Sequence, residues 1–314
     1  MADDNSEPGA PTPQAADKAS DRVASKSVAV PENAVSAAKQ LDRIILRLNK
    51  LLATPGGLSA FLSTFNYTLY ILAYLQPKLP SLAAHLSSLL ARLNPSSISK
   101  LPITILVADG AVPPIAALAG LISRCRTTLR LFGCFPLYAW LRTLLTGPKP
   151  GADAVLHRVA VLQASSYFTY QALENISVLA DNGVVPKSFI ARINRGDSTT
   201  ARVYLWAYRA WLGGVSCDFL RLAREAQLEN RRRAARRKMR EDGREVAVYQ
   251  EEADRKVDAK WWMDLMIATA WLPMALHFSS STGGLPGWNL GWMGVCGLVA
   301  GGERFRGMWR ATVS

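Results

Sequence analysis

The side chains that could bind a metal ion or act as nucleophiles are few and widely spaced in this chain. Its histidines and cysteines are His85, His157, His277, Cys125, Cys134, Cys217 and Cys296. A metal site needs such ligands at short, regular spacings, and a nucleophile needs a base beside it. The sequence has neither arrangement, and it lacks CxxC, Walker-type, GxGxxG and GxSxG motifs. We therefore predict a protein that is not an enzyme, with no catalytic residue, no metal ligand and no cofactor.

The composition favours an anionic partner. The 314 residues carry a formal net charge of +13 with a pI near 9.9, while charged residues make up only 19% and hydrophobic residues 49%. Such a balance is typical of proteins that bind nucleic acid or an acidic membrane surface. Nine tryptophans and nine tyrosines suit a lipid interface, although they would also suit a protein core. The widely spaced cysteines exclude a disulfide scaffold and fit a reducing compartment.

A basic amphipathic helix is predicted over residues 118–132. On a helical wheel, Leu118, Leu121, Ile122, Leu129 and Phe132 share one apolar arc of about 100°, and Arg124, Arg126 and Arg130 lie beside or opposite it. Such a helix can lie in the headgroup plane of a membrane with its apolar face buried about 5–10 Å deep. The same pattern also describes a surface helix that packs its apolar face on a protein core.

A second basic feature is a cluster within a long predicted helix. It consists of Arg231, Arg232, Arg233, Arg236, Arg237, Lys238 and Arg240. These side chains could form an anionic-lipid patch, since each Lys or Arg near an acidic membrane contributes about 1 kcal/mol. Alternatively, residues 229–260 are a solvated, charged helical linker.

The C-terminal part contains a long stretch without charge. The 38 residues between Asp264 and Glu303 include no Asp, Glu, Lys or Arg, which at helical rise is about twice the thickness of a hydrocarbon core. We predict a hydrophobic membrane anchor over 261–302, formed by two short passes or by one span and a re-entrant piece. Basic residues flank both ends, so both flanks, including the tail 303–314, are expected in the cytosol. Glycines four residues apart are expected to pack helices closely, namely Gly287, Gly291, Gly297 and Gly301.

The remaining chain is predicted to be helical as well. We expect a disordered tail over 1–40, helices over 41–52, 58–75, 79–93 and 157–181, and a long helix over 199–262 divided at Gly213-Gly214 and Gly243. The proline-broken tract 101–123 is either buried or membrane-embedded. The predicted fold class is all-α: a membrane-associated helical protein with amphipathic helices, one long helix and a C-terminal hydrophobic hairpin.

The order of these parts resembles the peroxin-11 family. The resemblance rests on Thr54-Pro-Gly-Gly before an apolar helix, the Arg-rich helix ending Leu129-Arg-Leu-Phe-Gly133, the segment 167–183 and the helix from Ala201 to Asp218-Phe-Leu-Arg-Leu. It covers roughly residues 41–228 and leaves the basic cluster outside the core pattern. It implies a peroxisomal membrane protein that elongates and proliferates the organelle, with an amphipathic helix at 118–132 inserted in one leaflet. It also implies termini in the cytosol, self-association and recruitment of fission machinery.

Two other functions fit parts of the sequence. A peroxisomal metabolite pore or channel would need several polar-lined spans, and the sequence has one hairpin and proline-broken tracts. A soluble nucleic-acid binder would use the arginine cluster, but the 38-residue uncharged tract argues against it. The expected partners are therefore anionic membrane lipids, further copies of this chain and fission machinery, and no nucleic acid.

Overall fold

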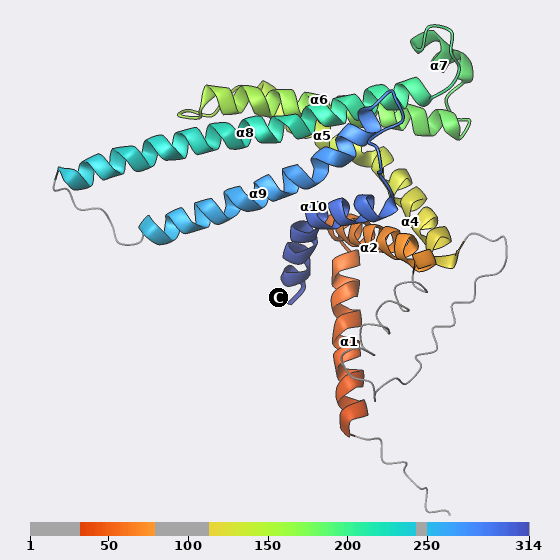
Figure 1. Ribbon diagram of the computed structural model, residues 1–314, viewed down its shortest axis with the longest axis horizontal. Helices are drawn as coiled ribbons and strands as arrows, with labels where there is room; N and C mark the ends of the chain where they lie inside the picture. Colours follow the sequence, from red (N-terminus) through yellow and green to blue (C-terminus); the bar gives the residue numbers. More distant parts are fainter. Residues whose placement is uncertain (1–31, 79–112, 243–249, 314) are drawn as a thin grey trace, which may run out of the picture. The chain divides into compact units, whose positions relative to one another are not determined.

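The computed structural model describes residues 32–78, 113–242 and 250–313, and within these ranges every regular element is a helix (Figure 1). The all-α prediction is thereby confirmed. The chain divides into two units, with the boundary between Leu48 and Asn49. The predicted helix 79–93, most of the tract 101–123 and His85 lie outside the described residues.

The first unit contains most of α1 (Glu32–Leu52). This helix begins inside the segment that the sequence assigned to a disordered tail. Its apolar stripe includes Leu41, Ile44 and Ile45, and each of these side chains is about half exposed. Lys39 and Arg43 are exposed on the other side, as the helical period predicts.

The second unit begins with the end of α1 and α2 (Pro55–Leu75), followed by the short helix η1 (Gln76–Lys78). The start of α2 follows from its sequence, because Thr54 Oγ1 accepts the Gly57 N–H at 3.0 Å and Pro55 occupies the first turn. Residues 55–78 form the one helix of the described chain that is long and apolar enough to cross a membrane, a criterion that buried helices of soluble proteins also meet.

Helix α10 (Leu290–Arg310), followed by η3 (Ala311–Val313), packs closely against α2. A Cβ atom at Gly291, Gly294 or Gly297 would lie 2.3 to 2.6 Å from Tyr74, Ile71 or Tyr67, closer than any real contact. The other two predicted glycines do not make such contacts. A Cβ atom at Gly301 would lie 3.8 Å from Ser63 Oγ, an ordinary contact distance, and Gly287 lies in the connection before α10 with φ of +72°. Glycine therefore sets the separation of these helices, mainly at a spacing of three residues.

Helix α8 (Ala201–Glu241) is the long helix that the sequence predicted, and it packs against α6 (Ala154–Asp181). The predicted break at Gly213-Gly214 is wrong, since α8 continues through both residues. A Cβ at Gly214 would lie 2.5 Å from the ring of Tyr167, so this glycine serves close packing. At the other end of the contact, Asp153 caps α6 and pairs with Arg224 at 2.7 Å. The hydrogen bond from Arg224 lowers the pKa of Asp153 to about 2, which keeps the pair ionised at physiological pH.

Helix α9 (Gln250–Ser279) lies along α8 and is joined to it by ion pairs (Figure 1). Arg221 lies 3.2 Å from Asp264, Arg233 2.7 Å from Asp258, and Arg236 2.8 Å from Asp254. As the residue number rises on α8 it falls on α9, so the two helices run antiparallel.

The uncharged tract forms the end of α9, a connection and the start of α10. The connection, residues 280–289, is held by His277, whose Nδ1 accepts the Leu285 N–H at 3.0 Å and whose ring stacks on Trp288. The uncharged helical pieces, 265–279 and 290–302, are about 20 Å long at 1.5 Å per residue, short of a hydrocarbon core of about 30 Å. Neither α9 nor α10 meets the length-and-hydropathy criterion, and the anchor over 261–302 stays a prediction.

The glycine contact between α2 and α10 generates a prediction with a built-in control. Replacing Gly297 by Ala should destabilise the protein by about 1–3 kcal/mol, because the new methyl group overlaps Tyr67. Replacing Gly302 by Ala, in the same helix but with nothing within 4 Å, should stabilise it by up to about 1 kcal/mol through helix propensity alone. Thermal unfolding of both variants in detergent measures the difference, and equal shifts would contradict the close contact.

Candidate membrane-binding surface

The amphipathic segment predicted at 118–132 lies in α4 (Pro114–Arg130) and η2 (Leu131–Gly133), which lead into α5 (Cys134–Leu145). Pro114 occupies the first turn of α4, where its missing N–H has no intrahelical acceptor to lose. Helix α4 packs on α2, and α5 packs on α6. At the junction, a Cβ on Gly133 would lie 2.9 Å from Gln171, so glycine lets η2 approach α6.

The apolar side of this segment faces away from the rest of the described chain. Leu118, Leu121, Leu129 and Phe132 are 39%, 55%, 43% and 66% exposed, and Ile122 is half-buried. We call these five residues the α4 apolar face. Exposed apolar side chains continue into α5 with Phe135 and Tyr138. In the surface-helix alternative this face would pack on a protein core, and within the described residues these side chains are largely exposed.

Two of the three arginines on the segment point into the helix assembly instead. Arg126 Nη2 donates to Ser63 Oγ of α2 at 3.1 Å, and its guanidinium lies 4.8 Å from the centre of the Tyr67 ring. The buried amide of Asn66 also accepts from Arg126 Nη1 at 3.0 Å when its nitrogen donates to the Ala119 carbonyl. Arg126 thus links α4 to α2.

Arg130 links α4 to α6 through a buried carboxylate. Its Nη2 lies 2.9 Å from Glu174 Oε1, and the side chain of Glu174 is only 4% exposed. Tyr170 and Gln171 donate to the same carboxylate at 3.1 and 3.3 Å. Burial raises the pKa of Tyr170, and the neighbouring Glu174 carboxylate raises it further, so the phenol stays a donor. These donors compensate the desolvation of Glu174.

Arg124 is exposed beside the α4 apolar face, and Arg130, whose side chain is 41% exposed, differs from it by its ion pair with Glu174. The predicted site residues therefore form two groups. The α4 apolar face and Arg124 are largely exposed, whereas Arg126 and Arg130 contact α2 and α6 and so position the helix. Their partners Asn66 and Glu174 were missed. One signal could have indicated Glu174, since it is the only charge between Arg158 and Asp181, the last residue of the helix.

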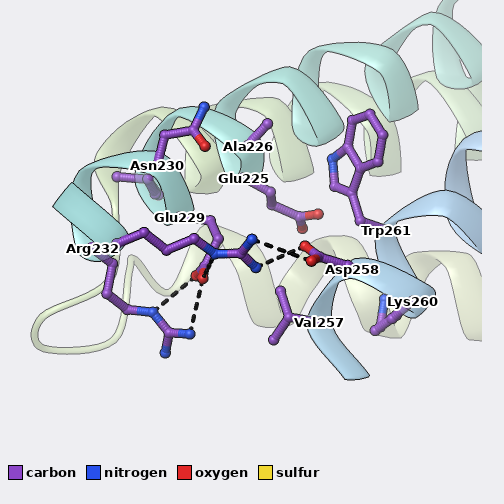
Figure 2. A pocket seen from close by; sticks show the side chains of 11 residues that line it. Glu225, Ala226, Glu229, Asn230, Arg232, Val257, Asp258, Lys260 and Trp261 are labelled. Atoms are coloured by element: carbon purple, nitrogen blue, oxygen red, sulfur yellow. Dashed lines mark hydrogen bonds and ion pairs between the residues drawn. The ribbon is translucent and has the colours of Figure 1, made fainter. Parts of the chain in front are cut away.

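The predicted lipid patch separates in the same way. Arg232, Arg233 and Arg236 form ion pairs with Glu229 or with acidic residues of α9. The pairs of Arg232 and Arg233 border a cleft of about 480 Å³ between α8 and α9, which Val257 and Trp261 also line (Figure 2). Arg231, Arg237, Lys238 and Arg240 are exposed and form no ion pair within the described residues. No group of metal ligands is present in the part of the chain that the structure describes.

The ion pair of Arg130 with Glu174 predicts that substitutions of Arg130 and of Arg124 will have different effects on stability. Arg130→Gln should destabilise the protein by about 1–3 kcal/mol, because it removes a charged donor from the buried Glu174 carboxylate. Arg124→Gln removes the same charge from an exposed position and should change stability by less than about 0.5 kcal/mol. Chemical unfolding in detergent compares the two, and similar effects would refute the positioning role of Arg130.

Comparison with known proteins gives one match. A protein-family model described as peroxisomal biogenesis factor 11 (PEX11) matches residues 103–299, well over half of the chain. Searches of curated proteins and of solved structures gave no significant match. The matched range begins after α2 and includes α4 to α9 and the first half of α10. It also includes the basic cluster, which the resemblance drawn from the sequence left outside the family pattern. This protein belongs to the PEX11 family of peroxisomal biogenesis factors.

Proposed function

We propose that this PEX11 protein remodels and elongates the peroxisomal membrane by inserting the α4 apolar face into one leaflet, and that it thereby promotes peroxisome proliferation and fission. Family membership supports the peroxisomal membrane as its place of action. The observation that carries the mechanism is the orientation of α4. Its apolar side chains are exposed while Arg126 and Arg130 are held by α2 and α6.

The geometry suits a shallow wedge. An amphipathic helix buried about 5–10 Å deep expands one leaflet more than the other and so favours curvature. Arg124 beside the apolar face and the exposed cluster of Arg231, Arg237, Lys238 and Arg240 would attract anionic headgroups. Since Arg126 and Arg130 fix α4 on the helices behind it, insertion would be transmitted to the whole second unit. Self-association and contact with fission machinery would concentrate these wedges.

A matched pair of leucines tests the proposal. Leu121 on α4 and Leu162 on α6 are both 55% exposed. Leu121→Gln combined with Phe132→Gln should weaken binding of the purified protein to anionic liposomes at least about tenfold, since each buried apolar side chain contributes about 1.5–3 kcal/mol. Leu162→Gln should leave binding and tubulation unchanged.

Three results would contradict the wedge. The first is an equal loss of liposome binding in Leu162→Gln. The second is undiminished tubulation by the double variant Leu121→Gln with Phe132→Gln. The third is leakage of sealed vesicles without a change of shape, which would favour a pore. Arg124→Glu adds an electrostatic control, because it should weaken binding to anionic vesicles about tenfold and leave neutral vesicles unaffected.

We also propose that both termini face the cytosol. Basic residues precede the uncharged tract, and Arg304, Arg306 and Arg310 follow it, which favours the cytosolic side for both flanks. Protease added to intact peroxisomes should remove epitope tags from both ends of the chain. Protection of the C-terminal tag would mean that the tract crosses the membrane once.

A further inference from the structure

A second basic site lies in a cleft where α6, α8 and α7 (Lys187–Ile193) meet. The cleft has a volume of about 640 Å³. Three arginines line it, Arg195, Arg202 and Arg209, together with Trp206, and no carboxylate does. Figure 1 shows α7 beside the end of α6 and the beginning of α8, the region that brings these residues together.

The α8 contribution is a stripe along one helical face. Arg202, Trp206 and Arg209 are spaced four and three residues apart, so their side chains lie in a row. The guanidinium of Arg209 lies 5.2 Å from the centre of the Trp206 ring, and its Nε donates to the Ser279 carbonyl at 3.3 Å. Both terminal nitrogens of Arg209 then remain available, since no hydrogen bond from them is present within the described residues.

The third arginine occupies a position where its backbone is unfavourable. Arg195 follows α7 with φ of +57°, and it is the one non-glycine residue with positive φ in the described chain. Helices commonly place glycine at this point, because a Cβ atom is strained there. Gly196 follows directly with φ of +98°. Arginine at a glycine position is explained if its side chain is needed in the cleft.

The acidic residues at the end of α6 and just before α8 accept hydrogen bonds from neighbouring residues. Asp197 accepts the Thr199 N–H at 2.8 Å and the Thr199 hydroxyl at 3.0 Å. Asp181 accepts from Thr200 and Tyr204 at 2.7 and 2.9 Å. Asp197 is close enough to Arg202 for the two charges to interact, but neither carboxylate lines the cleft, whose lining carries three positive charges and no negative one.

Apart from Thr169 and Asn194, the rest of the lining is apolar. The apolar part consists of Leu173, Ile193, Val203, Ala210 and the ring of Trp206, and the amide of Asn194 donates to the Thr199 carbonyl. Guanidinium groups bind phosphate oxygens through paired, charge-assisted hydrogen bonds, and the apolar wall suits hydrocarbon or a glycerol backbone. A ligand that satisfies both parts has a phosphate group attached to an apolar portion.

We propose that this cleft binds the phosphate headgroup of a single anionic phospholipid, with the phosphate held by Arg195, Arg202 and Arg209 and the start of the acyl portion against Leu173, Ile193 and Val203. This site is separate from the α4 apolar face and does not depend on membrane insertion. It would select lipids by headgroup, whereas the α4 face would bind any membrane with a suitable surface charge.

The test measures binding of short-chain lipids to the full-length protein in detergent by calorimetry. Dioctanoyl phosphatidate should bind, and Arg195→Gly and Arg202→Gln should each weaken it about tenfold or more, the loss of one charge-assisted contact to phosphate. Arg192→Gln removes the same charge from an exposed residue of α7 that does not line the cleft, and it should bind as the parent does.

Arg195→Gly separates binding from folding. Glycine relieves the positive φ at this position, so the unfolding temperature should stay the same or rise while binding is lost. Equal affinity for dioctanoyl phosphatidylcholine would overturn the proposal, since the arginines would then select nothing. Inorganic phosphate binding as tightly as phosphatidate would overturn the lipid assignment in favour of a soluble phosphate, and unchanged affinity in Arg195→Gly and Arg202→Gln would exclude the cleft.

Discussion

Charged side chains in this sparsely charged helical assembly need partners, and that requirement decides which side of α4 faces outward. Arg126 finds Ser63 and Asn66 on α2, and Arg130 finds Glu174 on α6. Turning α4 around would bury its leucines but leave these arginines and the Glu174 carboxylate without each other, a cost that opposes the gain from burying the apolar groups. The contacts of Arg126 and Arg130 therefore favour the orientation in which the apolar face is exposed.

Helix α2 carries both contacts that hold the second unit together near the candidate surface. On one side it supplies Ser63 and Asn66 to α4, and on the other its Tyr67 and Ile71 lie against the glycines of α10. Tyr67 belongs to both, since its ring also contacts the Arg126 guanidinium. A change in how α4 lies at a membrane would therefore reach α10 through little more than two turns of α2.

The sequence was sufficient for the helical class, the family and the two faces of the amphipathic segment, because each depends on local period and composition. It was insufficient for the direction of those faces, since the partner of Arg130 lies 44 residues away. The break expected at Gly213-Gly214 failed for a similar reason: Tyr167 on another helix uses the space that Gly214 leaves. Gly294 was not predicted to pack helices, because the prediction used a spacing of four residues, whereas the close glycines of α10 are three residues apart. In the basic cluster, charge density was evident, but pairing with Asp254 and Asp258 depends on how α8 and α9 align.

The ion pairs between α8 and α9 give the hairpin formed by these helices an unequal stability along its length. Near the end of α8 and the beginning of α9, the contact depends on ion pairs of Arg232, Arg233 and Arg236, which water and salt can reach. Nearer the other helices, Trp261 donates to the carbonyl of the buried residue Leu222. Exposed ion pairs weaken within the range of physiological and elevated ionic strengths, while apolar packing does not. Amide hydrogens in the outer turns would consequently exchange in a salt-dependent manner while those of the inner turns stay protected, which makes the outer hairpin a separate cooperative unit of the protein.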